Sequence, residues 1–197
     1  NKLVIPKQGF DDFFIHDELK DDLSLQHKDL LKTMKMHNDD DQNFFLYLHY
    51  SNIHTGIMND VLKVYNNFSK EFFDNKEQNE KRYDVLFDNA EKYLKSIMDE
   101  IKKLKLEDDS LILIMSDHGI SVGEKFGERA YGSFCYDYTL RTFTYFLSEE
   151  FTSRKISQQI RTIDFMPTIL DFLKIPFDNN YEKADGASLM ALIRGSS

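Results

Sequence analysis

Five consecutive apolar residues, Leu111 to Met115, place the strongest constraint on the fold of this 197-residue chain. An unbroken apolar run of this length predicts a strand that is buried on both faces. The run stops at Ser116, and Asp117, His118 and Gly119 follow directly. Ligands of α/β sheets bind at the carboxyl ends of strands, so Asp117 and His118 are candidates for a pair that handles a metal or a phosphate. In the alternative interpretation, Asp117 caps the next turn and His118 is a surface residue.

A second strand and a long helix precede this run. Phe44 to Tyr50 is almost continuously apolar, which predicts another covered strand. Val85 to Leu104 carries apolar residues at a spacing of 3.6, with Lys and Glu on the other face, which predicts an amphipathic helix. Strand, helix and strand in this order form a βαβ unit with parallel strands. We therefore expect an α/β fold with a largely parallel or mixed central sheet sandwiched between helices.

Shorter elements flank this unit. Periodic leucines predict a helix over Leu19 to Met36, and Thr142 to Leu147 is expected to form a strand. A short helix is expected over Asp164 to Leu173, with Asp164 as its N-cap and Pro167 in its first turn, where proline is tolerated.

Composition excludes several classes of protein. Hydrophobic residues make up 41% of the chain, which is enough for a core, and the length favours one domain. The net charge of −9 argues against nucleic-acid binding. No apolar run approaches the roughly 20 residues of a membrane span, and no signal peptide begins at Asn1. The single cysteine, Cys135, cannot form an internal disulfide; we expect a small apolar residue in a half-buried segment rather than a nucleophile.

Several motifs together resemble the sulfatase branch of the alkaline phosphatase superfamily. The specific ones are SDHGISVGE (116–124) and the DFMPT segment within IDFMPTILDFLKI (163–175). Three further segments agree in the order of the family: GFDDFF (9–14), NFFLYLHYSNIHTG (43–56) and DGASLMALIRG (185–195). The resemblance covers nearly the whole chain.

The resemblance implies roles for particular residues. Asp117 and His118 would be metal ligands, and His54 would contact the transferred group or protonate the leaving oxygen. Lys125 or Arg129 would bind the anionic oxygens of a sulfate- or phosphate-ester substrate, although both also suit a solvated surface. The implied cofactor is a divalent metal, with Ca²⁺ first and Mg²⁺, Mn²⁺ or Zn²⁺ as alternatives. His54, Asp117 and His118 are expected to meet at one edge of the sheet.

One departure from the family affects substrate specificity. Ordinary sulfatases place a Lys or His shortly before a segment that corresponds here to YDYTLR (136–141). Here Tyr131, Gly132, Ser133 and Phe134 stand at that place, so the usual cation is missing or is replaced by Arg129. A phosphoesterase or phosphoglycerol-transferase relative of the same superfamily is therefore an alternative.

The family's nucleophile and its early acidic metal ligands have no counterpart in this sequence. We therefore expect residues 1–197 to be the C-terminal part of a sulfatase-like domain, whose missing N-terminal half is its partner. Without that half the chain is expected to be inactive, and one edge of its sheet would lie exposed. The remaining alternative is a non-catalytic domain that kept the fold and binds a partner.

Overall fold

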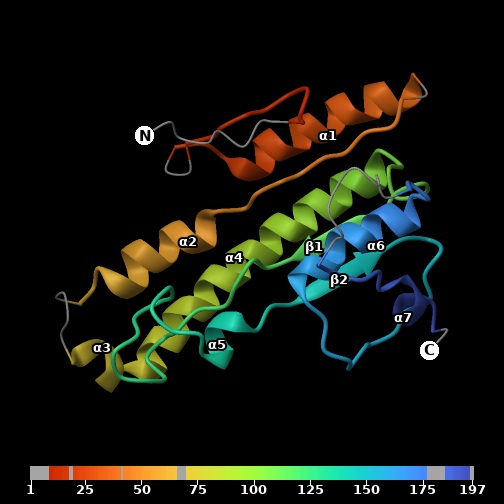
Figure 1. Cartoon of the computed structure of the whole chain (residues 1–197). Coiled ribbons are helices and arrows are strands. Elements are labelled where there is room, and N and C mark those ends of the chain that lie inside the picture. Colours follow the sequence, from red (N-terminus) through yellow and green to blue (C-terminus); the bar gives the residue numbers. More distant parts are fainter. Residues whose placement is uncertain (1–8, 18–19, 41, 66–69, 177–184, 196–197) are drawn as a thin grey trace. The chain divides into compact units, whose positions relative to one another are not determined.

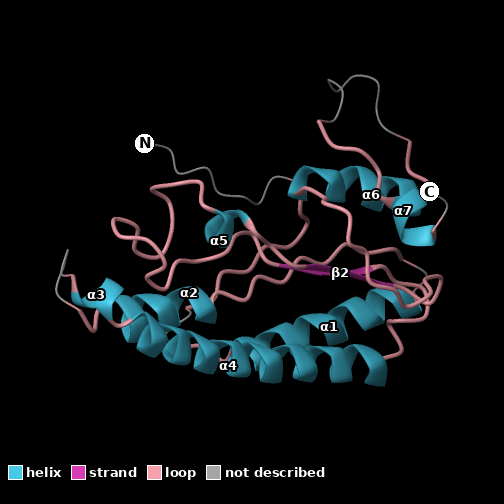
Figure 2. Cartoon of the chain, turned by 90° about the horizontal axis from the view of Figure 1, so that it is seen from below, coloured by secondary structure: helices cyan, strands magenta, loops and turns pink. Residues whose placement is uncertain are grey.

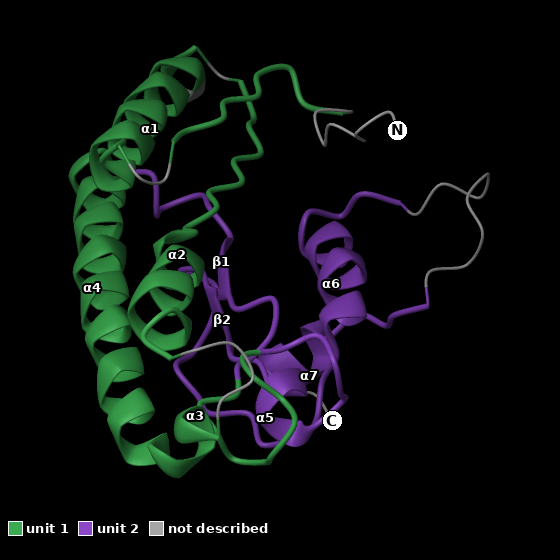
Figure 3. Cartoon of the chain, turned by 90° about the vertical axis from the view of Figure 1, so that its left-hand side faces the viewer, with its two compact units in different colours: residues 1–104, 121–130 green, residues 105–120, 131–197 purple. Residues whose placement is uncertain are grey.

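The computed structural model describes residues 9–17, 20–40, 42–65, 70–176 and 185–195 (Figure 1). The chain divides into two compact units, which Figure 3 distinguishes by colour. Unit 1 comprises residues 1–104 and 121–130, and unit 2 comprises residues 105–120 and 131–197.

Unit 1 is built on one long helix. Its elements are α1 (Leu23–Asp39), α2 (Asn52–Gly56), the π-helical segment η1 (Ile57–Leu62), α3 (Glu71–Asp74) and α4 (Lys76–Lys103). The elements α1, α2, η1 and α3 all contact α4, and α1 runs beside it (Figure 2). Apolar side chains from each of the helical elements except α2 are buried in this unit: Leu23, Leu31, Ile57, Val61, Phe72, Leu86, Ile97 and Ile101.

The amphipathic pattern of α4 is confirmed. Leu86, Ile97 and Ile101 are buried on one face. The other face carries lysine–carboxylate pairs at the i,i+4 spacing, such as Lys81–Glu77 at 2.6 Å and Lys95–Asp99 at 2.6 Å, although exposed pairs of this kind contribute only a few tenths of a kcal/mol. Burial of the apolar stripe is therefore the main reason that this segment forms a helix. The helix predicted over Leu19 to Met36 is also confirmed, as α1 over Leu23–Asp39, and Leu19 lies outside the described residues.

The strand predicted over Phe44 to Tyr50 is not found. Residues 43–50 have no regular secondary structure, although Figure 1 shows them as an extended stretch between α1 and α2. Both faces were expected to be covered, but Phe45 and Tyr47 are each 65% exposed. The physical reason is that no backbone–backbone hydrogen bond joins residues 43–50 to any other described residue.

Unit 2 contains a two-stranded sheet and short helices. Its elements are β1 (Ile112–Met115), α5 (Asp137–Leu140), β2 (Thr144–Leu147), the 3₁₀ turn η2 (Thr162–Asp164), α6 (Phe165–Phe172) and α7 (Met190–Arg194). The strands pair antiparallel, with Ile112 opposite Leu147 and Met115 opposite Thr144. Both strands were predicted within two residues of their observed bounds.

The largely parallel central sheet is not present among the described residues. The pairing of β1 with β2 is antiparallel, and the expected parallel neighbour, residues 43–50, forms no ladder. The apolar run of β1 is half-buried for three residues and exposed at Met115, rather than buried on both faces. A covered strand was inferred from composition alone, whereas coverage depends on neighbours that the run does not encode.

The helix predicted over Asp164 to Leu173 is confirmed as α6, with Pro167 in its first turn. Asp164 precedes the helix, but its carboxylate accepts hydrogen bonds from Arg161 N at 2.9 Å and Ala187 N at 3.0 Å instead of capping α6. Cys135 is exposed, so the prediction of a half-buried apolar role was wrong. Across the described residues, no helix combines the length and the apolar character that crossing a membrane requires.

Candidate functional site

The Asp-His-Gly turn begins where β1 ends, and Ser116 fixes that end. Ser116 N donates to Phe143 O at 3.2 Å, and Phe143 N donates back to Ser116 Oγ at 3.3 Å. Phe143 leads directly into β2. This reciprocal pair continues the β1–β2 contact by one residue, so the turn leaves the sheet from a fixed position.

Gly119 brings the turn against α5. Gly119 N donates to Thr139 O at 2.9 Å. A Cβ atom at this position would lie 2.2 Å from Tyr138 O and 3.1 Å from Arg141 O. These are backbone atoms that cannot move aside easily, so a residue without a side chain is required here.

Asp117 and His118 form the chemical part of the turn. Asp117 Oδ1 accepts a hydrogen bond from His118 N at 2.8 Å, which orients the carboxylate beside its neighbour. Asp117 Oδ2 lies 3.7 Å from His118 Nε2. The Asp117 side chain is 73% exposed and that of His118 is 41% exposed, so both groups are accessible to a ligand.

The tautomer of His118 follows from its contacts. His118 Nδ1 lies 2.7 Å from Gly119 O. A carbonyl oxygen only accepts hydrogen bonds, so Nδ1 carries the proton and a neutral ring keeps the lone pair on Nε2. Metal-binding histidines commonly have this arrangement, with one nitrogen donating to a carbonyl and the other facing the ion. The Tyr131 ring packs beside the imidazole, with 4.3 Å between ring centroids.

Two donors are fewer than a hard divalent cation needs, because such ions take about six oxygen-rich ligands. Within the described residues, no group of three or more His, Cys, Asp or Glu side chains could hold a metal ion. Asp117 Oδ2 and His118 Nε2 therefore fit two positions of a divalent-metal site, and this chain's described residues do not complete it.

His54 lies in the last turn of α2 and is exposed. Ser51, directly before the helix, is buried and accepts a hydrogen bond from Thr55 N at 3.1 Å, which anchors the start of α2. His54 belongs to unit 1, and Asp117 and His118 belong to unit 2. That these three residues meet at one site stays a prediction.

The loop that carries Lys125 and Arg129 belongs to unit 1. Ser121 N donates to Ala130 O at 2.6 Å and closes the loop at its base. Lys125 is exposed on the loop. Arg129 instead turns inward: Nη2 donates to Leu62 O at 3.1 Å, and the guanidinium lies 5.2 Å from the centroid of the Phe72 ring. These contacts favour a structural role for Arg129. Lys125 is the better candidate for binding an anion because its side chain is exposed.

Asn79 holds this loop and was not singled out from the sequence. It is fully buried on α4, and its Nδ2 donates to Phe72 O at 2.8 Å and to Val122 O at 2.9 Å. Its Oδ1 accepts from Tyr65 Oη at 2.7 Å. The sequence did carry a signal for this role. Asn79 lies seven residues, or two helical turns, before Leu86, so a polar amide stands on the same face of α4 as the buried apolar side chains.

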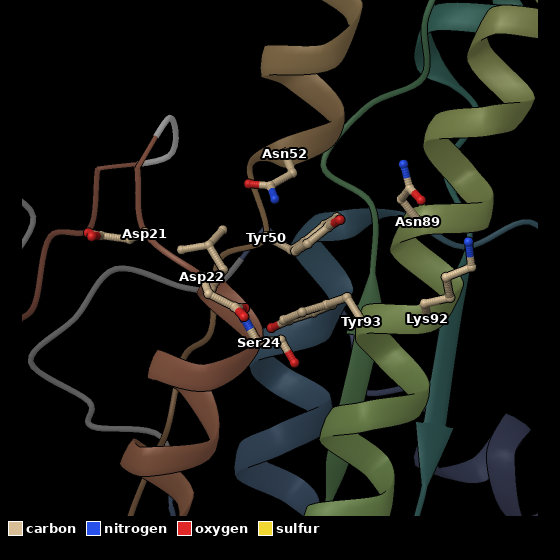
Figure 4. A pocket seen from close by; sticks show the side chains of 9 residues that line it. Asp21, Asp22, Ser24, Tyr50, Asn52, Asn89, Lys92 and Tyr93 are labelled. Atoms are coloured by element: carbon tan, nitrogen blue, oxygen red, sulfur yellow. The ribbon is translucent and has the colours of Figure 1, made fainter.

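A polar hollow of about 420 Å³ lies in unit 1, beside the start of α2 (Figure 4). The rings of Tyr50 and Tyr93 stack there, with 4.1 Å between their centroids. Burial raises the pKa of both phenols. At the start of α1, Asp22 Oδ1 accepts a hydrogen bond from Ser24 N at 2.9 Å, so this carboxylate has a structural role. None of the predicted site residues is among the lining residues: Asp21, Asp22, Leu23, Ser24, Tyr50, Asn52, Asn89, Lys92 and Tyr93.

Comparison with known proteins supports the resemblance seen in the motifs. A family model described as Sulfatase matches residues 1–175. A solved structure titled "Crystal structure of Ps i-CgsB" is similar in fold, with a TM-score of 0.63 and 20% sequence identity. The match covers 87% of this chain and 37% of that protein, so the chain spans little more than a third of its length. No curated protein sequence matches the chain.

Proposed function

Because this chain belongs to the sulfatase family, we propose that it forms part of a metal-dependent sulfuric-ester hydrolase. The observation that carries the proposal is the Asp-His-Gly turn, in which the Gly119 carbonyl fixes the proton on His118 Nδ1 and leaves Nε2 available as a ligand. The match over residues 1–175 includes this turn.

The proposed roles follow the chemistry of each side chain. Asp117 and His118 hold a divalent cation, Ca²⁺ or one of Mg²⁺, Mn²⁺ and Zn²⁺, which neutralises negative charge on the transferring group when bound. His54 donates a proton to the leaving oxygen. The ammonium group of Lys125 pairs with the anionic oxygens of the ester, and Arg129 stabilises the loop that presents it.

The chain supplies one part of the proposed catalytic domain. It spans 37% of the similar solved structure, and the part of the chain that the structure describes brings two metal donors together at the Asp-His-Gly turn, where about six are needed. We assign the remaining ligands and the nucleophile to a complementary N-terminal part of the domain. Covalent catalysis divides one difficult displacement into two easier steps, and it requires that nucleophile.

A phosphoester substrate is the second candidate, and a specific observation favours it. The cation that ordinary sulfatases carry before the YDYTLR segment is absent from residues 131–134. Arg129, the nearest replacement, donates to Leu62 O and packs on Phe72. Without the cation that ordinary sulfatases carry at this place, the match to a sulfate ester is weakened, which favours phosphate-ester hydrolysis or phosphoglycerol transfer as the alternative.

An assay of turnover tests the proposal. The 197-residue chain and a form extended at its amino terminus to a complete sulfatase domain are each given an aryl sulfate and an aryl phosphate. We expect no turnover by the shorter chain and metal-dependent turnover by the longer form, abolished by His118→Ala. Turnover by the shorter chain that His118→Ala abolishes would refute the division of the site. A longer form that turns over neither ester would instead favour a non-catalytic binding domain.

A further inference from the structure

The orientation of the His118 imidazole decides which of its nitrogens can bind a ligand. Rotation of a histidine ring about its last side-chain bond has broad, two-fold minima, so the side chain itself does not fix where each nitrogen lies. One contact favours a single orientation here, because His118 Nδ1 lies 2.7 Å from Gly119 O. The His118 side chain is 41% exposed, so water competes for that hydrogen bond and reduces its net contribution. A second contact is therefore needed to hold the ring.

The Tyr131 ring supplies that contact. Its centroid lies 4.3 Å from that of the His118 imidazole, and the two ring planes are inclined at 45°. Tyr131 is half-buried, and both residues belong to unit 2. A half-buried ring at this distance restricts rotation of the imidazole, and aromatic pairs contribute attraction beyond the area that they bury.

The backbone on both sides of Tyr131 fixes its place. Ala130 has a φ of +67° and Gly132 has a φ of +95°, so Tyr131 stands between two residues in the left-handed region. Ala130 is also buried. A left-handed conformation at a residue with a Cβ atom persists only where the surrounding structure imposes it. The contact between Tyr131 and His118 therefore follows from a defined backbone path and is not a chance meeting of two surface side chains.

We propose that Tyr131 is a positioning residue for His118. Its ring holds the imidazole in the orientation in which Nδ1 donates to Gly119 O and Nε2 keeps its lone pair for a cation. The inference rests on the proposed function for what Nε2 binds. Tyr131 acts through its ring and not through its hydroxyl group, so Tyr131→Phe preserves the effect and Tyr131→Ala removes it.

NMR spectroscopy of the histidine ring nitrogens tests this inference on the 197-residue chain. Couplings between ring protons and nitrogens distinguish the Nδ1-protonated from the Nε2-protonated imidazole, and the spectrum of His118→Gln assigns the signals of His118. At about pH 8.5, where imidazole is ordinarily neutral, we expect the Nδ1-protonated form to predominate in the unchanged chain. Tyr131→Ala should lower the ratio of the Nδ1-protonated to the Nε2-protonated form by about five-fold, the scale of one aromatic pair, and Tyr131→Phe should retain it.

Tyr145→Ala is the matched control. Tyr145 is another tyrosine of unit 2, but it lies on β2, is 59% exposed and packs beside Phe143 with 6.0 Å between ring centroids. Its replacement should leave the ratio unchanged. Tyr131→Leu keeps an apolar side chain without an aromatic ring, so it should lower the ratio as Tyr131→Ala does and gives the same test where the alanine variant fails to fold.

Three results would overturn the inference: an unchanged ratio in a folded Tyr131→Ala or Tyr131→Leu variant, a Tyr131→Phe variant that behaves as Tyr131→Ala, or an equal effect of Tyr145→Ala. Turnover by the form extended to a complete sulfatase domain reports separately on the proposed function. Hydrolysis of an aryl sulfate by that form, with a ratio that Tyr131→Ala leaves unchanged, refutes only the positioning role. A ratio that falls as expected, with an extended form that hydrolyses neither ester, supports the positioning role and refutes only the proposed function.

Discussion

At the scale of single residues, the Asp-His-Gly turn depends on contacts that the motif does not show. Gly119 is needed because α5 approaches it: a Cβ atom would meet Tyr138 O at 2.2 Å. We expect Gly119→Ala to reduce the free energy of unfolding by at least about 2 kcal/mol, because backbone atoms must shift to admit the methyl group. Urea denaturation measures this effect.

Gly132→Ala is the matched control for Gly119→Ala. Gly132 has a φ of +95°, but a Cβ atom at this position would have no neighbouring atom within 4 Å, so only backbone strain of about 1 kcal/mol is expected. A Gly119→Ala variant that is no less stable than Gly132→Ala would contradict the close approach of α5.

Metal affinity also belongs to the residue scale. Asp117 and His118 offer two donors, and water must supply the other ligands, so we expect the 197-residue chain to bind Ca²⁺, Mg²⁺ or Mn²⁺ weakly. Calorimetric titration should show tighter binding by the form extended to a complete domain, and Asp117→Asn should weaken it. Tight binding by the shorter chain that Asp117→Asn does not change would place the metal elsewhere.

At the scale of elements, Asn79 joins α4 to the loop 121–130. Asn79→Ala removes the donors to Phe72 O and Val122 O and leaves Tyr65 Oη without its acceptor. Loss of partners for buried polar groups costs about 1–3 kcal/mol, so we expect a loss of about 3 kcal/mol and faster amide exchange over 121–130. Asn89→Ala, at an exposed residue of the same helix, is expected to change stability by less than about 0.5 kcal/mol. Equal effects of the two variants would show that Asn79 does not hold the loop.

Elements were predictable from the sequence where the signal is local. Residues close together in the sequence predicted three elements: α4 from its apolar stripe, β1 from its apolar run, and α6 from the proline in its first turn. All three elements are confirmed. Residues 43–50 were not predictable in the same way, because a strand needs a partner and the run encodes only its own alternation. The inward turn of Arg129 and the buried bonds of Asn79 likewise depend on residues far away in the sequence.

At the scale of the whole molecule, the two units are sensitive to acid in different pH ranges. In unit 2, the hydrogen bond from Arg161 and that from Ala187 N lower the pKa of Asp164 below its usual value of 3.8. Asp164 therefore stabilises the fold above that value, and its contribution is lost only as the pH falls through the lowered pKa. Unit 1 carries the opposite kind of group, a buried histidine that is neutral in the fold.

His27 sets the acid response of unit 1. Burial, with smaller contributions from His16 and His49, lowers its pKa from 6.5 to about 4, and its Nδ1 lies 2.6 Å from Tyr93 Oη on α4. Between these two values the unfolded chain binds a proton that the folded chain does not, so stability falls as the pH drops from 6.5 toward 4. We expect a loss of about 2 kcal/mol over this range. Urea unfolding followed by far-ultraviolet circular dichroism measures this loss, since α1 and α4 supply most of the described helix.

His27→Gln should remove most of this pH dependence, whereas His37→Gln, at an exposed position of α1, should keep it. A His27→Gln variant with the full pH dependence would assign the acid response to another group.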